Sequence, residues 1–190
     1  MKYLNIILTL LLVSCTTTKE ITVTSKVSNK HKVIAWYDVE KKTIWALSFP
    51  ISLNIINDDV KKELLYYQYN YKNSKRGKVI SLYEIEKDNS LILIKNFKKK
   101  ELKLDETNNF LILTKHIITG SELANKIVVG LDNKQLKNDS ISLGKFKDFK
   151  KRYSSSIKNL LNKDTLYIRF KIFEHNNRKK KRIKVPIKVN

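Results

Sequence analysis

Three histidines are the side chains of this chain best suited to binding a metal ion or transferring a proton near neutral pH. They are His31, His116 and His175, and long stretches of sequence separate them. Metal sites usually draw ligands from close pairs such as His-x-His, Glu-x-x-His or Cys-x-x-Cys, and none of these pairs is present around the histidines. We therefore expect three unrelated histidines, no metal site and no cofactor.

A serine run and a carboxylate pair are the other candidates for catalysis. Ser154–Ser156 lacks the Gly-x-Ser-x-Gly pattern of a nucleophile elbow, and four glycines cannot supply a phosphate-binding loop. Glu84 and Glu86 would project from one strand face roughly 7 Å apart, and carboxylates at such distances can hydrolyse glycosides. Alternation with Tyr83 and Ile85 explains the pair more simply, as the wet face of an amphipathic strand. The sequence predicts that this protein is not an enzyme.

Basic residues dominate the charge, with 39 Lys and Arg against 18 Asp and Glu, for a formal net charge of +21. The two densest runs are Lys98–Lys100 and the segment Arg178, Lys179, Lys180, Lys181 and Arg182. The second lies beside a predicted hairpin turn, where its charges could contact phosphate-bearing headgroups at about 1 kcal/mol each. A solvated turn that blocks edge-to-edge strand pairing is the alternative. Arginine, preferred for bidentate phosphate recognition, is scarce, and we expect no nucleic-acid partner.

The first residues have the features of an exported precursor. Lys2 supplies a positive charge, and the stretch from Ile6 to Val13 is apolar except at Thr9. Crossing a bilayer as a helix takes roughly 20 residues, and this stretch is much shorter. It fits the apolar region of a cleavable signal peptide.

The apolar stretch ends in Leu12-Val13-Ser14-Cys15. With an aliphatic residue three positions before the cysteine and a small residue just before it, this segment resembles the lipobox of bacterial lipoproteins. The resemblance implies a diacylglycerol thioether on Cys15, cleavage between Ser14 and Cys15, and acylation of the new amino terminus. Two or more acyl chains anchor a protein stably, so the protein is expected to be held at a membrane.

The lipoprotein resemblance also implies a place in the cell envelope. An aspartate directly after the cysteine marks some lipoproteins for the inner membrane, and Thr16 stands there instead. We therefore expect an outer-membrane protein that faces the periplasm. Lys19-Glu20 is a poor match to the acidic cluster that exports some lipoproteins, although exposure at the cell surface stays open.

The expected domain organisation is simple. Residues 1–14 form the signal peptide, residues 15–30 a lipidated amino terminus and flexible tether, and residues 31–190 one strand-rich domain. Cys15 is the only cysteine, so no disulfide can form within the mature chain. The domain must therefore rely on packing alone.

The hydrophobic patterns favour strands over helices. Strand regions are predicted at 33–39, at 43–56 with an interruption at Pro50, at 78–86, 91–94, 101–104, 110–118 and 141–143, and in a hairpin formed by 166–172 and 183–189. A short helix is predicted up to about Leu64, then a strand in hairpin with 78–86. A long helix is predicted from Phe146 to Leu161. We expect a mainly β, antiparallel, β-sandwich-like fold with one or two helices, or alternatively an α+β fold.

Two non-enzymatic functions fit these features. The first is a membrane-anchored envelope lipoprotein that acts as a binding or assembly module for an envelope protein partner. The second is an immunity-type lipoprotein, in which a basic surface would neutralise an acidic toxin that reaches the periplasm. An enzyme is a third hypothesis, which a pocket that gathers His116 with carboxylates would revive.

Overall fold

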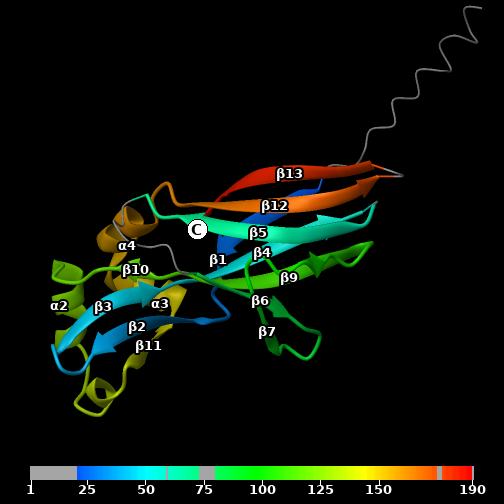
Figure 1. Ribbon diagram of the computed structural model, residues 1–190. Helices are drawn as coiled ribbons and strands as arrows, with labels where there is room; N and C mark the ends of the chain where they lie inside the picture. Colours follow the sequence, from blue (N-terminus) through cyan, green and yellow to red (C-terminus); the bar gives the residue numbers. More distant parts are fainter. Residues whose placement is uncertain (1–20, 59, 73–79, 175–176, 190) are drawn as a thin grey trace, which may run out of the picture.

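The structure is a computed structural model, and it describes residues 21–58, 60–72, 80–174 and 177–189. The chain is mainly β, with three antiparallel sheets and a group of helices at one end of the molecule (Figure 1). The predicted β-sandwich-like fold is confirmed. Three α-helices occur in the described ranges, where one or two were predicted.

Two of the sheets face each other and form the sandwich. The five-stranded sheet has the order β1-β4-β9-β6-β7, with bounds Thr22–Val27, Pro50–Asn57, Glu106–Leu113, Ser81–Ile85 and Leu91–Ile94. The second sheet has the order β13-β12-β5-β8, with bounds Asn177–Pro186, Thr165–Glu174, Lys62–Asn70 and Lys100–Glu101. Below these are called the large sheet and the C-terminal sheet.

Alternating apolar residues build the core between these sheets. Leu53 and Phe110 point inward from the large sheet, and Ile168 and Phe170 point inward from the C-terminal sheet, all with 0% exposure. Each such side chain contributes roughly 1.5–3 kcal/mol by leaving water. Because side chains alternate along a strand, this inner packing leaves the odd-numbered residues of β12 on the outer face.

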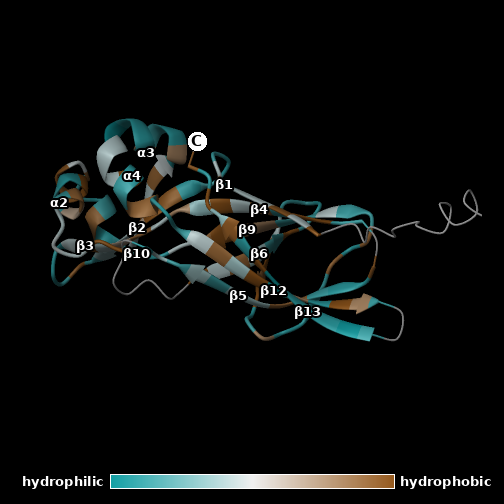
Figure 2. Cartoon of the chain, turned by 90° about the horizontal axis from the view of Figure 1, so that it is seen from above, coloured by the Kyte–Doolittle hydropathy of each residue, from teal (hydrophilic) through white to brown (hydrophobic). Residues whose placement is uncertain are grey.

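The third sheet carries the helices. It has the order β10-β3-β2-β11, with bounds His116–Ile117, Thr43–Ser48, Lys32–Asp38 and Ser140–Lys145. Helices α2 (Glu122–Val129), α3 (Phe146–Arg152) and α4 (Ser154–Leu161) cover one of its faces (Figures 1 and 2), and a 3-10 turn spans Gln135–Lys137. Phe49 contacts Phe146 and Phe149, with ring centroids about 6 Å apart, and so joins this sheet to α3.

Local patterns account for most of these elements. Pro50 begins β4 where the chain leaves β3 of the helix-bearing sheet, because a proline at the first strand position removes no interior ladder hydrogen bond. The predicted long helix has the right bounds and packs on the sheet as expected, but it divides at Tyr153, whose backbone leaves the helical region (φ −131°, ψ 35°). Tyr153 then starts a second helix on three serines, which favour helix ends over interiors.

The predicted helix near residue 60 is wrong. Asn57 ends β4, and its side-chain oxygen accepts a hydrogen bond from Lys62 Nζ at 2.7 Å. Strand β5 follows: Leu64 points into the core, the register shifts by one residue before Tyr66, and Tyr67 and Tyr69 then alternate into the core. The predicted hairpin with 78–86 is also wrong, since β5 pairs with β12 and β8.

The predicted tether is too long. Ile21 is buried in the sandwich core, and β1 pairs with β4 from Thr22↔Ile56 to Val27↔Ile51. The folded domain therefore begins about ten residues earlier than the sequence predicts. The polar composition of this segment matches an edge strand with a solvent-facing side, which composition alone does not distinguish from a linker.

Candidate anionic-surface interface

The predicted basic run lies on β13, the edge strand of the C-terminal sheet (Figure 2, where the first half of β13 is hydrophilic). Side chains alternate along a strand, so the run divides between two faces. The register pairs Arg182 with Arg169 and Lys180 with Lys171, and these residues share the outer face with Arg178. Lys179 and Lys181 point to the other side, so the prediction that the hairpin holds all five charges together is wrong.

The outer face gains three basic residues that the run does not contain. They are Arg169 and Lys171 on β12, and Lys184 on β13. We call the set of six the basic face: Arg169, Lys171, Arg178, Lys180, Arg182 and Lys184. All are exposed except the half-buried Lys171. Sequence reasoning missed the three added residues, although the alternation of β12 read together with the hairpin register would have identified them.

Aromatic rings lie beneath these cations. The guanidinium of Arg182 lies 4.3 Å from the ring centre of Tyr167, and Lys171 Nζ lies 4.7 Å from that of Phe173. Such contacts contribute about 0.5–1 kcal/mol each at exposed sites. They hold the cations against the sheet, with their charges open to solvent.

Few carboxylates balance this face. Glu63 on β5 lies opposite Lys171, and Glu101 on β8 bonds Lys61 at 2.9 Å, which raises the pKa of that lysine. Glu174, at the hairpin end, bonds Lys179 at 2.6 Å. Within the described ranges, none of the six cations of the basic face forms an ion pair.

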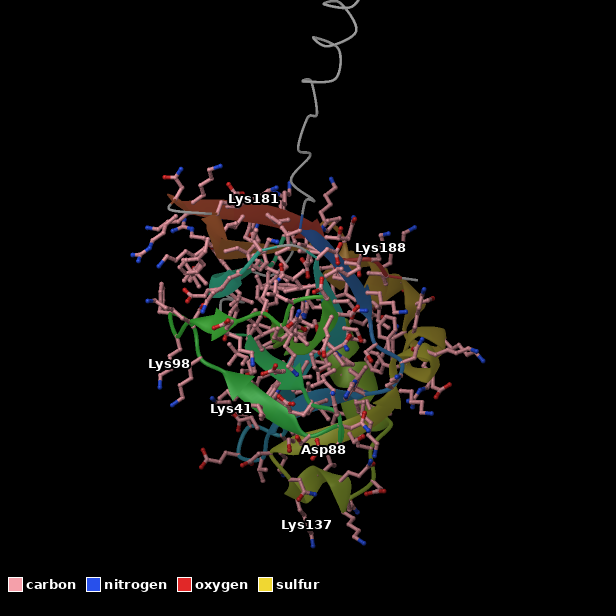
Figure 3. The ribbon with its side chains drawn as sticks, turned by 90° about the vertical axis from the view of Figure 1, so that its right-hand side faces the viewer. Lys41, Asp88, Lys98, Lys137, Lys181 and Lys188 are labelled. Atoms are coloured by element: carbon pink, nitrogen blue, oxygen red, sulfur yellow. The ribbon has the colours of Figure 1, made fainter. Side chains whose placement is uncertain are left out.

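The other basic run lies elsewhere. Lys100 forms an ion pair with the buried Glu84, while Lys98 and Lys99 are exposed in the turn after β7. Figure 3 places Lys98 at the side of the molecule and Lys181 at its top. The two runs therefore do not combine into one surface.

The predicted carboxylate pair has partners of its own. Glu84 is buried against Lys100, and Glu86 lies 4.0 Å from Lys103. Both line a polar groove of about 610 Å³ on the large sheet, with His31 and asparagine side chains. Each carboxylate is thus matched by a lysine, which favours a structural role over glycoside hydrolysis.

His116 sits in a buried polar network, which its sequence position does not reveal. Its Nε2 donates to Asp164 Oδ2 at 2.8 Å, and both side chains have 0% exposure. The Tyr69 hydroxyl donates to the same oxygen at 3.1 Å, and the Lys72 backbone N–H donates to Asp164 Oδ1 at 2.9 Å. Because Tyr69 and His116 belong to different sheets, the network joins the C-terminal sheet to the helix-bearing one.

The same network extends to Phe49, where the chain passes from β3 of the helix-bearing sheet to β4 of the large sheet. Thr114 Oγ1 lies 3.1 Å from His116 Nδ1 and accepts the Phe49 backbone N–H at 3.0 Å. Burial raises the pKa of Tyr69, and the charge of Asp164 raises it further. Because neither His116 nor Asp164 reaches solvent, their contact supports the junction of the two sheets and offers no open site to a substrate.

The other candidate residues remain apart. Ser154–Ser156 begins α4, and His31 bonds the Ser28 hydroxyl at 3.1 Å. His175, Ser14 and Cys15 lie outside the described residues. Over the described ranges, no group of three or more His, Cys, Asp or Glu side chains is arranged to hold a metal ion.

No helix in the described part of the chain is both long and apolar enough to span a membrane. Comparison of the whole chain with protein-family models, with curated proteins and with solved structures finds no match.

Proposed function

We propose that this protein is a lipid-anchored envelope protein that acts as a non-enzymatic binding module and lies with its basic face on an anionic lipid surface. The anchor would be the lipid on Cys15, which would hold the protein on the periplasmic side of an outer membrane. The observation that carries the proposal is the basic face, with six cations and no internal ion pair in the described structure.

The arrangement of charges on this face opposes folding. Arg169 lies directly opposite Arg182, and Lys171 directly opposite Lys180. Like charges in such cross-strand positions destabilise a sheet by a few tenths to about 1 kcal/mol per pair. A surface rich in anionic headgroups would relieve this repulsion, and each cation would contribute about 1 kcal/mol of binding.

The start of the folded domain lies beside the basic face. Strand β1 runs along the end of β13, where Ser25 Oγ donates to the Pro186 carbonyl at 2.7 Å and the Val27 N–H donates to Lys188 O at 3.1 Å. Figure 3 shows β1 and β13 together at the top of the molecule. Six residues lie between Cys15 and Thr22, so their Cα atoms are at most about 25 Å apart, and an anchor at Cys15 would keep β13 close to the bilayer.

Vesicle flotation tests the proposal on a chain that begins at Thr16 and carries no lipid. We expect it to bind vesicles that contain phosphatidylglycerol, to ignore vesicles of phosphatidylcholine alone, and to dissociate between about 50 and 500 mM salt. The variant Lys180→Glu/Arg182→Glu should bind at least thirtyfold more weakly, for a loss of about 2–4 kcal/mol.

A matched control is available at the opposite end of the molecule. Lys134→Glu/Lys137→Glu makes the same change of net charge beside the 3-10 turn, and Figure 3 shows Lys137 far from Lys181. We expect this variant to keep most of the binding. Equal losses in the two variants would mean that overall charge, and no particular face, governs binding.

The same face suits the second hypothesis, an immunity-type inhibitor of an acidic toxin. That function predicts tight, stoichiometric binding of one protein, encoded beside this one, and no preference for anionic vesicles. Vesicle flotation therefore separates the two functions.

A further inference from the structure

Strand β7 exposes an unusual row of aliphatic side chains. Leu91, Ile92 and Leu93 are 42%, 49% and 49% exposed, and only Ile94 reaches the core. β7 is also the edge of the large sheet, since no strand in the described structure pairs with its other side. Exposed apolar edge strands are templates for pairing with another chain, and proteins usually protect them.

The register shows which backbone groups face the open edge. The Glu86 N–H donates to Ser90 O at 3.0 Å, in line with the pairs Ile85↔Leu91 and Tyr83↔Leu93. Antiparallel pairs alternate between hydrogen-bonded and non-hydrogen-bonded. Because the Glu86–Ser90 pair is bonded, the N–H and C=O groups of Leu91 and Leu93 point away from β6, toward solvent.

A basic segment directly follows this edge. Lys95, Lys98 and Lys99 are exposed, and with Leu93 and Ile94 they line a shallow cavity of about 240 Å³. No ion pair in the described ranges involves these three lysines, whereas Lys100 is held by Glu84. The edge therefore combines open backbone groups, aliphatic side chains and a positive end.

We propose that β7 is a docking site for an extended acidic segment of a partner protein, which adds to the large sheet as a further strand. Backbone bonds to Leu91 and Leu93 supply the pairing, and alternate side chains of the segment meet the aliphatic row. Antiparallel pairing is the more stable arrangement, and it places the amino-terminal end of the segment beside Lys95 and Lys98. The segment thus carries its acidic residues before its apolar ones.

Charge complementarity selects this occupant over a second copy of the chain. A copy would bring a molecule with the same formal net charge of +21 against an already basic edge. An acidic segment instead neutralises lysines that have no carboxylate partner in the described structure. The site is separate from the basic face, so it gives the module a protein partner in addition to a lipid surface.

The experiment measures fluorescence anisotropy of labelled peptides with the full lipidated chain in mild detergent. The probe has three acidic residues followed by alternating threonine and valine, and its control has the same residues in reverse order. We expect the first peptide to bind at least tenfold more tightly than the second. Equal affinity of the two orders would overturn the proposed direction and contact, and dimerisation through β7 would overturn the choice of occupant.

Two variants test the site itself. Leu93→Pro removes an N–H that β6 does not use, so the fold should survive, yet peptide affinity should fall at least tenfold. Leu93→Ala keeps the N–H and serves as its matched control, with a smaller loss. Lys95→Glu/Lys98→Glu should reverse the preference, so that a lysine-led peptide binds in place of the acidic one. Unchanged affinity in the proline variant, at an unchanged melting temperature, would refute strand addition.

Discussion

Removal of the Asp164 carboxylate should destabilise the whole domain, because this group is the acceptor on which three donors converge. His116 Nε2, the Tyr69 hydroxyl and the Lys72 backbone N–H all donate to it, at 2.8, 3.1 and 2.9 Å. Asp164→Ala leaves these donors without their partner, and the side chains of Asp164 and His116 are fully buried, so water does not replace the lost acceptor of the histidine.

The expected loss follows from this geometry. Each buried donor left unsatisfied costs about 1–3 kcal/mol, and a hydrogen bond to a charged acceptor contributes about 1.5–3 kcal/mol. Because the donors share one acceptor and can relax together, we expect a total near 4 kcal/mol. For a domain of this size, that loss lowers the melting temperature by roughly 8–16 °C.

Urea unfolding followed by tryptophan fluorescence measures the loss, with Asp38→Ala as the matched control. Asp38 bonds the backbone N–H of Lys41 at 2.9 Å in a surface turn, so its removal should cost less than about 1 kcal/mol. Asp164→Asn keeps one acceptor oxygen, so its loss of stability should lie between those of Asp164→Ala and Asp38→Ala. If Asp164→Ala unfolded within 1 kcal/mol of the parent chain, the network would not join the sheets as described.

Two further predictions concern the buried aromatic groups. Burial raises the pKa of Tyr69 and of Tyr71 above the ordinary value of 10.0. The folded state therefore holds these protons more tightly than the unfolded state, and the stability present below pH 10 should decline as the pH rises further. Ultraviolet titration should show full ionisation of both hydroxyls only on unfolding. Ionisation of both hydroxyls in the folded chain would contradict their burial. Phe149→Ala removes a fully buried ring that contacts Phe49, and it should lower the free energy of unfolding by about 3–5 kcal/mol. Phe97→Ala removes a ring that is 79% exposed, and it should lower the free energy of unfolding by less than about 1 kcal/mol. Similar losses for the two variants in urea unfolding would disprove the assigned packing.

The sequence predicted the elements that depend on local pattern. Alternation identified the hairpin of β12 and β13, and Pro50 marked where one strand ends and another begins. The stripe of Phe146, Phe149, Ile157 and Leu161 identified the helices that cover the third sheet. In each case, the residues that decide the structure lie on one element or on two elements that follow each other directly in the chain.

Long-range pairing could not be predicted in the same way. β5 pairs with β12, about a hundred residues later, and nothing in the local pattern of Leu64 or Tyr69 indicates that partner. His116 and Asp164 are 48 positions apart and meet only because the helix-bearing sheet and the C-terminal sheet lie together at this point. The basic face depends on the same kind of information, because Arg169 joins Arg182 only through the strand register.

Mass spectrometry of the amino-terminal peptide, taken from protein extracted from envelope membranes, tests the lipid anchor most directly. The proposal predicts a mature chain that begins at Cys15 and carries the added mass of a diacylglyceryl group and an amide-linked acyl chain. A mature chain that begins at another residue, or an unmodified Cys15 thiol, would contradict it.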